Sequence, residues 1–164
     1  MFYFVVRYLR WLAQVPGFPQ VFDAFLLAST CILRRSRFVA MEALEVEALR
    51  LRDVRVKNHR FGGIEFIEGE GRELGHLHGH GLLDVFVPLE TAQALIATGR
   101  VRSHHVFPNS RWISFQIESN ADIPFALELL TMARTSVPSE SDVKAQILTA
   151  SRGELHSTTD RAVA

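Results

Sequence analysis

The chain has a single cysteine, and features of several common protein classes are missing with it. Cys31 alone excludes an internal disulfide and a zinc site built from paired cysteines, which fits a reducing compartment. Lysine plus arginine and aspartate plus glutamate both number 18, so no net basic field attracts nucleic acid. We therefore expect a cytoplasmic protein with no nucleic-acid partner.

Nucleotide-binding loops are missing as well. The Gly-x-Gly patterns at 69–71 and 79–81 lack the later glycine, the phosphate-binding lysine and the following helix of such loops. No flavin signature is present. A serine hydrolase is not indicated, because neither Ser110 nor Ser114 lies in a glycine-flanked elbow. The sequence thus identifies no cofactor, although its histidines could bind a divalent transition metal.

No apolar run reaches the roughly 20 residues that a spanning helix needs, although residues 1–40 are unusually apolar. Residues 2–14 and Val21–Leu33 predict two short helices, separated by PGFP at 16–19, so we expect an apolar N-terminal helical hairpin. It could pack on the domain or in a homo-oligomer interface. Alternatively, residues 1–37 could bind the inner face of a membrane, with arginines toward anionic lipid.

The rest of the chain changes from a helical period to a period of two. Residues 40–54 predict a helix, and alternating strands follow, joined near Gly79 by a hairpin turn. We expect a two-layer α+β domain over 41–138, with an antiparallel sheet of four or five strands and helices on one face. Residues 139–164 are expected to form a polar C-terminal helix and tail.

Histidines are concentrated in one short stretch, ELGHLHGHG at 73–81. Residues i and i+2 of a strand share a face, so we expect His76 and His78 to point to one side and Glu73 to the other. Asp84 in the following strand is expected to be semi-buried, and a buried carboxylate needs a partner. An imidazole across the hairpin is the expected partner.

Three interpretations of this stretch stay open. His76, His78 and His104 could bind Zn, Fe or Mn, with one position left for an activated water. His76 or His78 could instead act as general acid or base, oriented by Asp84 or Glu65. In the third interpretation, Asp84 and its imidazole form a structural hydrogen-bond network that fixes the register of the hairpin.

The motifs HRFGGIEF, ELGHLHGHGLLDVFVP, LIATGR and HHVFPNSRWISFQI follow one another within roughly residues 46–135. In these motifs the chain resembles the small bacterial and fungal domain family called luciferase-like. The sequence departs from the family pattern at His80 and Arg111. The resemblance supports a set of family-type positions, which includes Arg60, Glu65, Glu73, His76, His78, Asp84, His104, His105, Ser110 and Trp112.

We predict a domain that binds a small molecule at this histidine and carboxylate cluster and could also transform it. The predicted catalytic residues are His76, His78, Asp84 and Glu65. The predicted ligand contacts are Arg60, which would hold an anionic group, together with Glu73, His104, His105, Ser110 and Trp112. The alternative is a non-enzymatic membrane-surface or dimerisation module in which the cluster is structural. Whether the protein is an enzyme stays open at this point.

Overall fold

The computed structural model describes residues 17–60, 62–104, 108 and 110–136, which build one antiparallel sheet and the helices around it. Its six strands lie in the order β1-β2-β3-β4-β6-β5. The strands are β1 (Val54–Asn58), β2 (Ile64–Glu68), β3 (Arg72–Leu77), β4 (Leu82–Phe86), β5 (Arg102–Ser103) and β6 (Trp112–Gln116). The α+β class is confirmed. The count of four or five strands is wrong, because a two-residue strand such as β5 is too short to show alternation.

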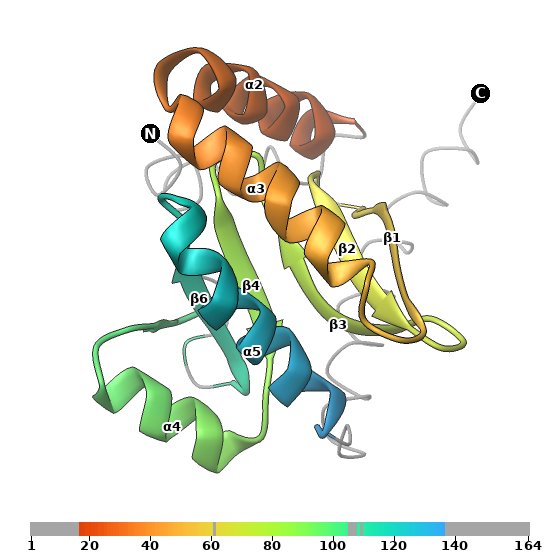
Figure 1. Cartoon of the computed structure of the whole chain (residues 1–164), viewed down its shortest axis with the longest axis vertical. Helices are drawn as coiled ribbons and strands as arrows, with labels where there is room; N and C mark the ends of the chain where they lie inside the picture. Colours follow the sequence, from red (N-terminus) through yellow and green to blue (C-terminus); the bar gives the residue numbers. More distant parts are fainter. Residues whose placement is uncertain (1–16, 61, 105–107, 109, 137–164) are drawn as a thin grey trace, which may run out of the picture.

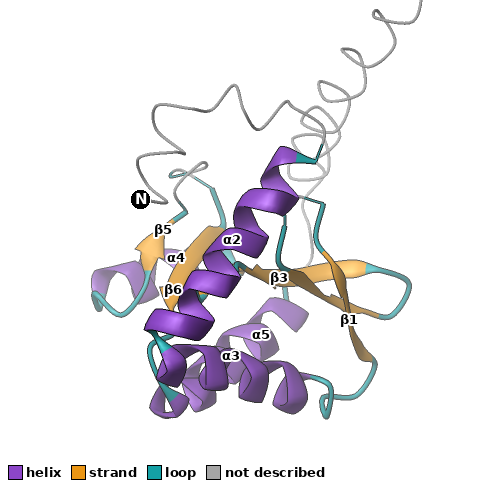
Figure 2. Ribbon diagram, turned by 90° about the horizontal axis from the view of Figure 1, so that it is seen from above, coloured by secondary structure: helices purple, strands orange, loops and turns teal. Residues whose placement is uncertain are grey.

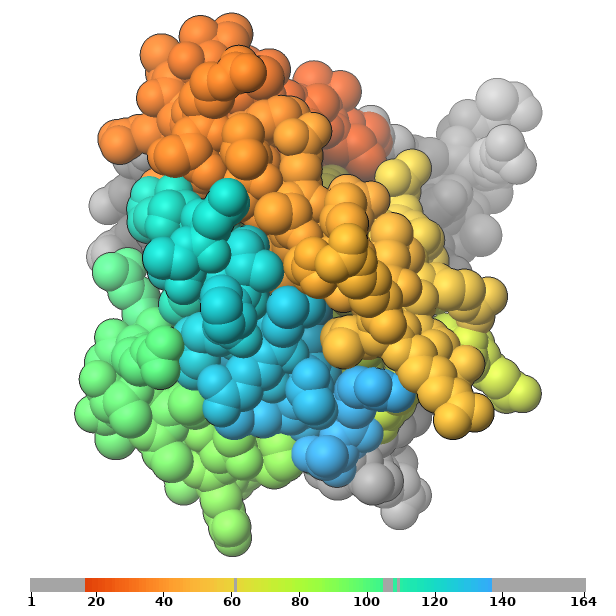
Figure 3. Space-filling view, in the orientation of Figure 1, coloured from red at the N-terminus to blue at the C-terminus, as the bar shows by residue number. Residues whose placement is uncertain are grey.

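Helices α3 (Arg35–Ala48) and α5 (Ile123–Arg134) cover one face of the sheet (Figure 1). Their atoms lie side by side over this face in the space-filling view (Figure 3). Apolar residues recur on both helices at helical spacing and meet the inward side chains of the strands. Among the fully buried members of this core are Leu44, Phe66, Leu83, Ile113 and Leu129.

Strand β6 alternates as its sequence predicts. In β6, Ile113 and Phe115 enter the core, while Ser114 faces the opposite side of the sheet. Helix α4 (Leu89–Ala97) begins after Pro88, whose fixed φ suits a helix start, and contacts β5 and β6. The sheet therefore has one face packed on α3 and α5 and a second face on which polar side chains gather.

The N-terminal helices differ in their bounds from the prediction. Helix α2 (Phe18–Leu33) ends at Arg34, whose backbone leaves the helical region at φ −138° and ψ 55°, and α3 begins directly afterwards at Arg35. The helix predicted over 40–54 thus starts earlier. It also ends earlier, because the chain turns through Asp53 at φ 62° before β1. The described hairpin is consequently formed by α2 and α3.

Helix α2 crosses the end of the sheet, as the view from above shows (Figure 2). A Cβ added to Gly79, in the β3–β4 turn, would lie 2.5 Å from the carbonyl oxygen of Asp23 and 2.7 Å from the amide nitrogen of Leu27. The absence of a side chain at Gly79 is therefore what lets the helix backbone approach the turn. This contact brings Asp23 to the face of the sheet that α3 and α5 leave open.

Two predicted helices, over 2–14 and 139–151, lie outside the described residues, and the division of the chain at residues 40 and 138 stays a prediction. Within the described stretches, no helix has both the length and the apolar character that crossing a bilayer requires.

Candidate functional site

A row of polar residues runs straight across the open face of the sheet. Residues paired between antiparallel strands lie on the same face, so each cross-strand pair extends the row by one strand. In sheet order the row is Lys57, Glu65, His76, Asp84, Ser114 and Arg102. The antiparallel register alone therefore brings together residues up to 57 positions apart, counting from Lys57 to Ser114 (114 − 57 = 57).

A β-bulge in β3 changes which residues share this face. Phe66 of β2 pairs with Gly75, but the next residue, Ile67, pairs with Glu73, so Leu74 is an extra residue. Leu74 enters the core with Leu77, and Glu73 turns to the open face. The prediction that Glu73 points away from His76 is therefore wrong, because it assumed an unbroken strand.

Asp84 is the centre of the site and has no exposed surface. Its Oδ2 lies 3.1 Å from Nε2 of His78 and 3.5 Å from Nε2 of both His76 and His104. Its Oδ1 accepts a hydrogen bond from the hydroxyl of Ser114. The expectation that Asp84 pairs with an imidazole across the hairpin is confirmed, and three imidazoles rather than one surround it.

Carboxylates stand behind two of these rings. Oε1 of Glu73 lies 2.7 Å from Nδ1 of His76, and Oδ1 of Asp23 lies 3.7 Å from Nδ1 of His78. Asp23 is fixed in turn by the amide of Gly79, which donates to its Oδ1 at 2.9 Å. Each ring is thus oriented by a carboxylate on one nitrogen and presents the other nitrogen to Asp84.

The charges of these groups stabilise one another. Burial alone would raise the pKa of Asp84, but its contacts with His76 and His78 hold that pKa well below the usual value. Burial likewise opposes protonation of His76, yet its contacts with Asp84 and Glu73 raise the pKa of this ring to about 9. The pKa of His78 is also raised, because Asp23 and Asp84 outweigh the effect of burial. The buried centre is therefore an array of alternating charges.

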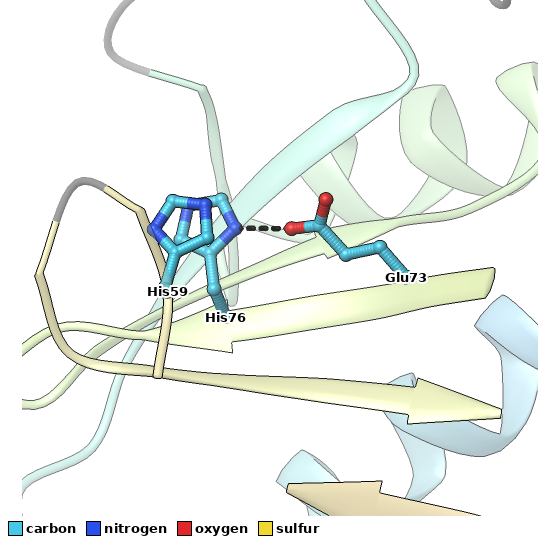
Figure 4. Close-up of side chains that lie close together, drawn as sticks. All are labelled: His59, Glu73 and His76. Carbon is cyan, nitrogen blue, oxygen red and sulfur yellow. Dashed lines mark hydrogen bonds and ion pairs between the residues drawn. The ribbon is translucent and has the colours of Figure 1, made fainter. Parts of the chain in front are cut away.

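His59, from the turn after β1, stacks on His76 (Figure 4). Their ring centroids are 4.2 Å apart and their planes differ by 5°. Burial, together with the neighbouring charge of His76, lowers the pKa of His59 to about 4, so its ring is neutral. Because His59 covers one face of the His76 ring, a partner reaches the nitrogens of His76 in the plane of the ring.

Two sets of three residues have ligand atoms within 4.8 Å of one another: His59, Glu73 and His76, and His76, His78 and Asp84. A metal ion lies in the ring plane of a histidine ligand, along the nitrogen lone pair. The parallel stack of His59 on His76 aims their lone pairs side by side, whereas the rings of His76 and His78 meet at 89°. The second set is therefore the better geometry for one ion.

His104 belongs to neither set, although we predicted it as a metal ligand with His76 and His78. It follows β5 and reaches Asp84 across β6, so it approaches from the side opposite to β3. Nε2 of His104 lies near Oδ2 of Asp84, the same oxygen that His76 and His78 approach. The three predicted histidines therefore share Asp84 as a common partner.

The other predicted site residues are placed at different distances from this centre. Trp112 packs beside this centre. The centroid of its ring lies 5.3 Å from that of His76 and 6.0 Å from that of His104. Glu65 is next to His76 in the row and forms an ion pair with Lys57, and burial, with the nearby charge of Glu73, raises its pKa.

Arg60 lies in the exposed turn after β1, where its carbonyl accepts a hydrogen bond from Gln20. The hydroxyl of Ser110 accepts a hydrogen bond from the amide of Trp112. His105 lies outside the described residues. No role in binding or catalysis is tested for any of these residues, and those roles stay predictions.

Sequence reasoning missed Asp23. The signal was a lone carboxylate in the otherwise uncharged sequence of α2, which is costly in a buried position unless it has a partner. Ser114 was considered only as a nucleophile, and the structure makes it a hydrogen-bond donor to Asp84.

Comparison with protein families identifies the segment that carries this centre. The family model described as the luciferase domain matches residues 71–133, which include His76, His78, Asp84 and His104. This segment is similar to the luciferase domain family. The predicted resemblance is thereby confirmed, although it was expected over roughly 46–135, and the matched luciferase domain leaves Arg60 and Glu65 outside it. No curated protein and no solved structure matches the chain.

The raised pKa of His76 predicts how stability changes with pH in metal-free protein. A group with a raised folded-state pKa stabilises fully below its unfolded value, about 6.5, and this stabilisation is lost as the pH rises through about 9. We expect the free energy of unfolding to fall by about 1–3 kcal/mol between pH 6 and pH 10 through this group. Urea denaturation at each pH, in buffer that contains a metal chelator, measures this free energy.

His76→Gln should remove most of that decline, since glutamine does not titrate. His80→Gln is the matched control, because burial and the neighbouring charge of His78 lower the pKa of His80 to about 4 and its ring is already neutral at pH 6. An unchanged decline in His76→Gln would contradict the charge assignment.

Proposed function

We propose that this domain binds a divalent transition-metal ion through His76, His78 and Asp84, and that the ion holds a small-molecule ligand. The observation that carries the proposal is the convergence of Nε2 atoms on one fully buried carboxylate oxygen. Two imidazoles and one carboxylate are a donor set that both zinc and non-haem iron(II) take in proteins.

The donor distances support this proposal. Two donors that each lie about 2.1 Å from a tetrahedral ion are about 3.4 Å apart. The separations between Oδ2 of Asp84 and Nε2 of His78 and His76 are 3.1 Å and 3.5 Å. An ion therefore needs little rearrangement of these side chains. His104, whose Nε2 is 3.5 Å from the same oxygen, is the nearest further donor.

The outer groups support it as well. Histidine ligands usually donate their second ring nitrogen to a carboxylate or carbonyl, which fixes the ring and raises its basicity. Glu73 and Asp23 occupy these positions behind His76 and His78. A bound ion would supply Lewis acidity or an activated water to the ligand.

Metal analysis of protein purified without a histidine tag tests the proposal. We expect about one zinc or iron ion per chain by inductively coupled plasma mass spectrometry, and loss of that ion in His78→Ala. Glu73→Gln should bind the same metal with about 10–100-fold lower affinity, since only the outer carboxylate is changed.

His59→Ala is the matched control, because His59 belongs to the other candidate set and should be dispensable for the metal. Loss of metal in His59→Ala together with its retention in His78→Ala would reverse the choice of site. Protein that binds no transition metal, even when it is supplied, would contradict the proposal and leave the cluster as a structural network.

A second candidate function, binding to a membrane surface, rests on α2. Its outer side exposes large apolar residues: 69% of Val21, 55% of Phe25 and 79% of Ile32 are accessible. Arg34 and Arg35 follow directly and are exposed. An apolar helix face beside cationic side chains suits an anionic lipid interface, and we propose lipid as the occupant of this face.

Co-sedimentation of the full chain with phosphatidylcholine vesicles, with and without phosphatidylserine, tests this second proposal. We expect binding that increases with phosphatidylserine and is weakened several-fold by Phe25→Ser. Leu89→Ser, on the exposed side of α4, is the matched control and should bind like the wild type. Binding that Phe25→Ser leaves unchanged would contradict the proposal, and a stable dimer without vesicle binding would assign the face to a second copy of the chain.

A further inference from the structure

A small pocket adjoins the centre on the open face of the sheet. Its cavity measures about 120 Å³, and it is lined by Leu82, Gly99, Arg100, Arg102, Ser114 and Gln116. A water molecule occupies about 30 Å³ in the liquid, so the volume suits a group the size of a carboxylate or a phosphate rather than a whole drug-sized molecule.

The pocket is connected to the metal-binding set by a single side chain. Ser114 lines the pocket and donates its hydroxyl to Oδ1 of Asp84. Asp84, Ser114 and Arg102 are consecutive members of the polar row, each paired with the next across the sheet. Two strand spacings separate Asp84 from Arg102, which is roughly 10 Å between their backbones.

The lining of the pocket is cationic and contains no carboxylate. Some arginines in the described part of the chain pair with acids, as Arg37 does with Glu118 and Arg72 with Glu68. Neither Arg100 nor Arg102 has such a pair among the described residues. Arg100 and Arg102 both line the pocket, and a guanidinium group offers an anion hydrogen-bond donors in the fork geometry that carboxylates and phosphates match.

Arg100 is held in place by a contact with an aromatic ring. The carbon of its guanidinium group lies 3.6 Å from the centroid of the Phe125 ring, a cation–π contact that anchors the side chain at the edge of the sheet. Gln116 donates its amide to the carbonyl of His80, which fixes the opposite wall. The fold thus orients Arg100 and Gln116, which lowers the entropic cost of binding an anion beside them.

We propose that this pocket binds the anionic group of the small-molecule ligand, a carboxylate or a phosphate, and that the rest of the ligand extends over Ser114 toward Asp84 and His76. The ligand is then a small organic anion. Arg60, which we predicted for an anionic group, lies in the exposed turn after β1 and does not line this pocket, so its predicted role is separate from this assignment. The part of this inference that places the other end of the ligand near Asp84 and His76 rests on the proposed metal site, whereas binding of the anionic group does not.

Titration of the full chain with inorganic phosphate and with acetate, followed by ¹⁵N–¹H NMR, tests the proposal. We expect saturable shifts of the amides of Gly99 and Ser114, with millimolar affinity for the isolated anion. Arg102→Gln and Arg100→Gln should each weaken binding tenfold or more. Arg55→Gln removes the same charge from β1, outside the pocket, and should leave the affinity within twofold of wild type.

The two probes separate the two anion sources: preference for phosphate indicates a phosphate ester, and preference for acetate indicates a carboxylic acid. The His76→Ala/His78→Ala variant should still bind the anion, so failure of the metal proposal and failure of this one are distinguishable. Shifts that do not saturate, or equal affinity in Arg102→Gln and wild type, would overturn the inference.

Discussion

The burial of Asp84 is the constraint on which the rest of the structure depends. A carboxylate without any exposed surface is stable in a protein interior only when opposite charges and hydrogen-bond donors replace water. Here three imidazoles and one hydroxyl do so. Because these partners come from β3, the turn after it, β6 and the residue after β5, the carboxylate fixes the register of the sheet around it.

Two local features of the backbone complete this arrangement. The bulge at Leu74 turns Glu73 toward His76, and the close approach of α2 at Gly79 brings Asp23 to His78. Both features deliver a carboxylate to the outer nitrogen of a ring. The sheet and α2 thus orient two imidazoles from both sides, which is the arrangement expected of metal ligands, and a pocket lined by two arginines opens beside them.

Much of this centre could be predicted from the sequence because strand alternation and the hairpin turn act over short distances. The spacing of His76, His78 and Asp84 places them together once the hairpin is recognised. The bulge could not be predicted, since no residue in the β3 sequence distinguishes a bulged strand from a regular one. The lone carboxylate of Asp23 in α2 indicates a buried partner, but which partner it contacts, like the position of His104, depends on the tertiary packing of α2 and β5.

The most direct test of the central claim is X-ray absorption spectroscopy of the full chain loaded with one equivalent of zinc. The account predicts two imidazole nitrogens at about 2.0 Å, visible through the outer-shell scattering of their rings, and a carboxylate oxygen at about 2.0–2.2 Å. One imidazole should disappear from the spectrum of His78→Ala. A zinc shell without imidazole scattering, or one that His78→Ala leaves unchanged, would contradict the assignment of Asp84, His76 and His78 as a metal centre.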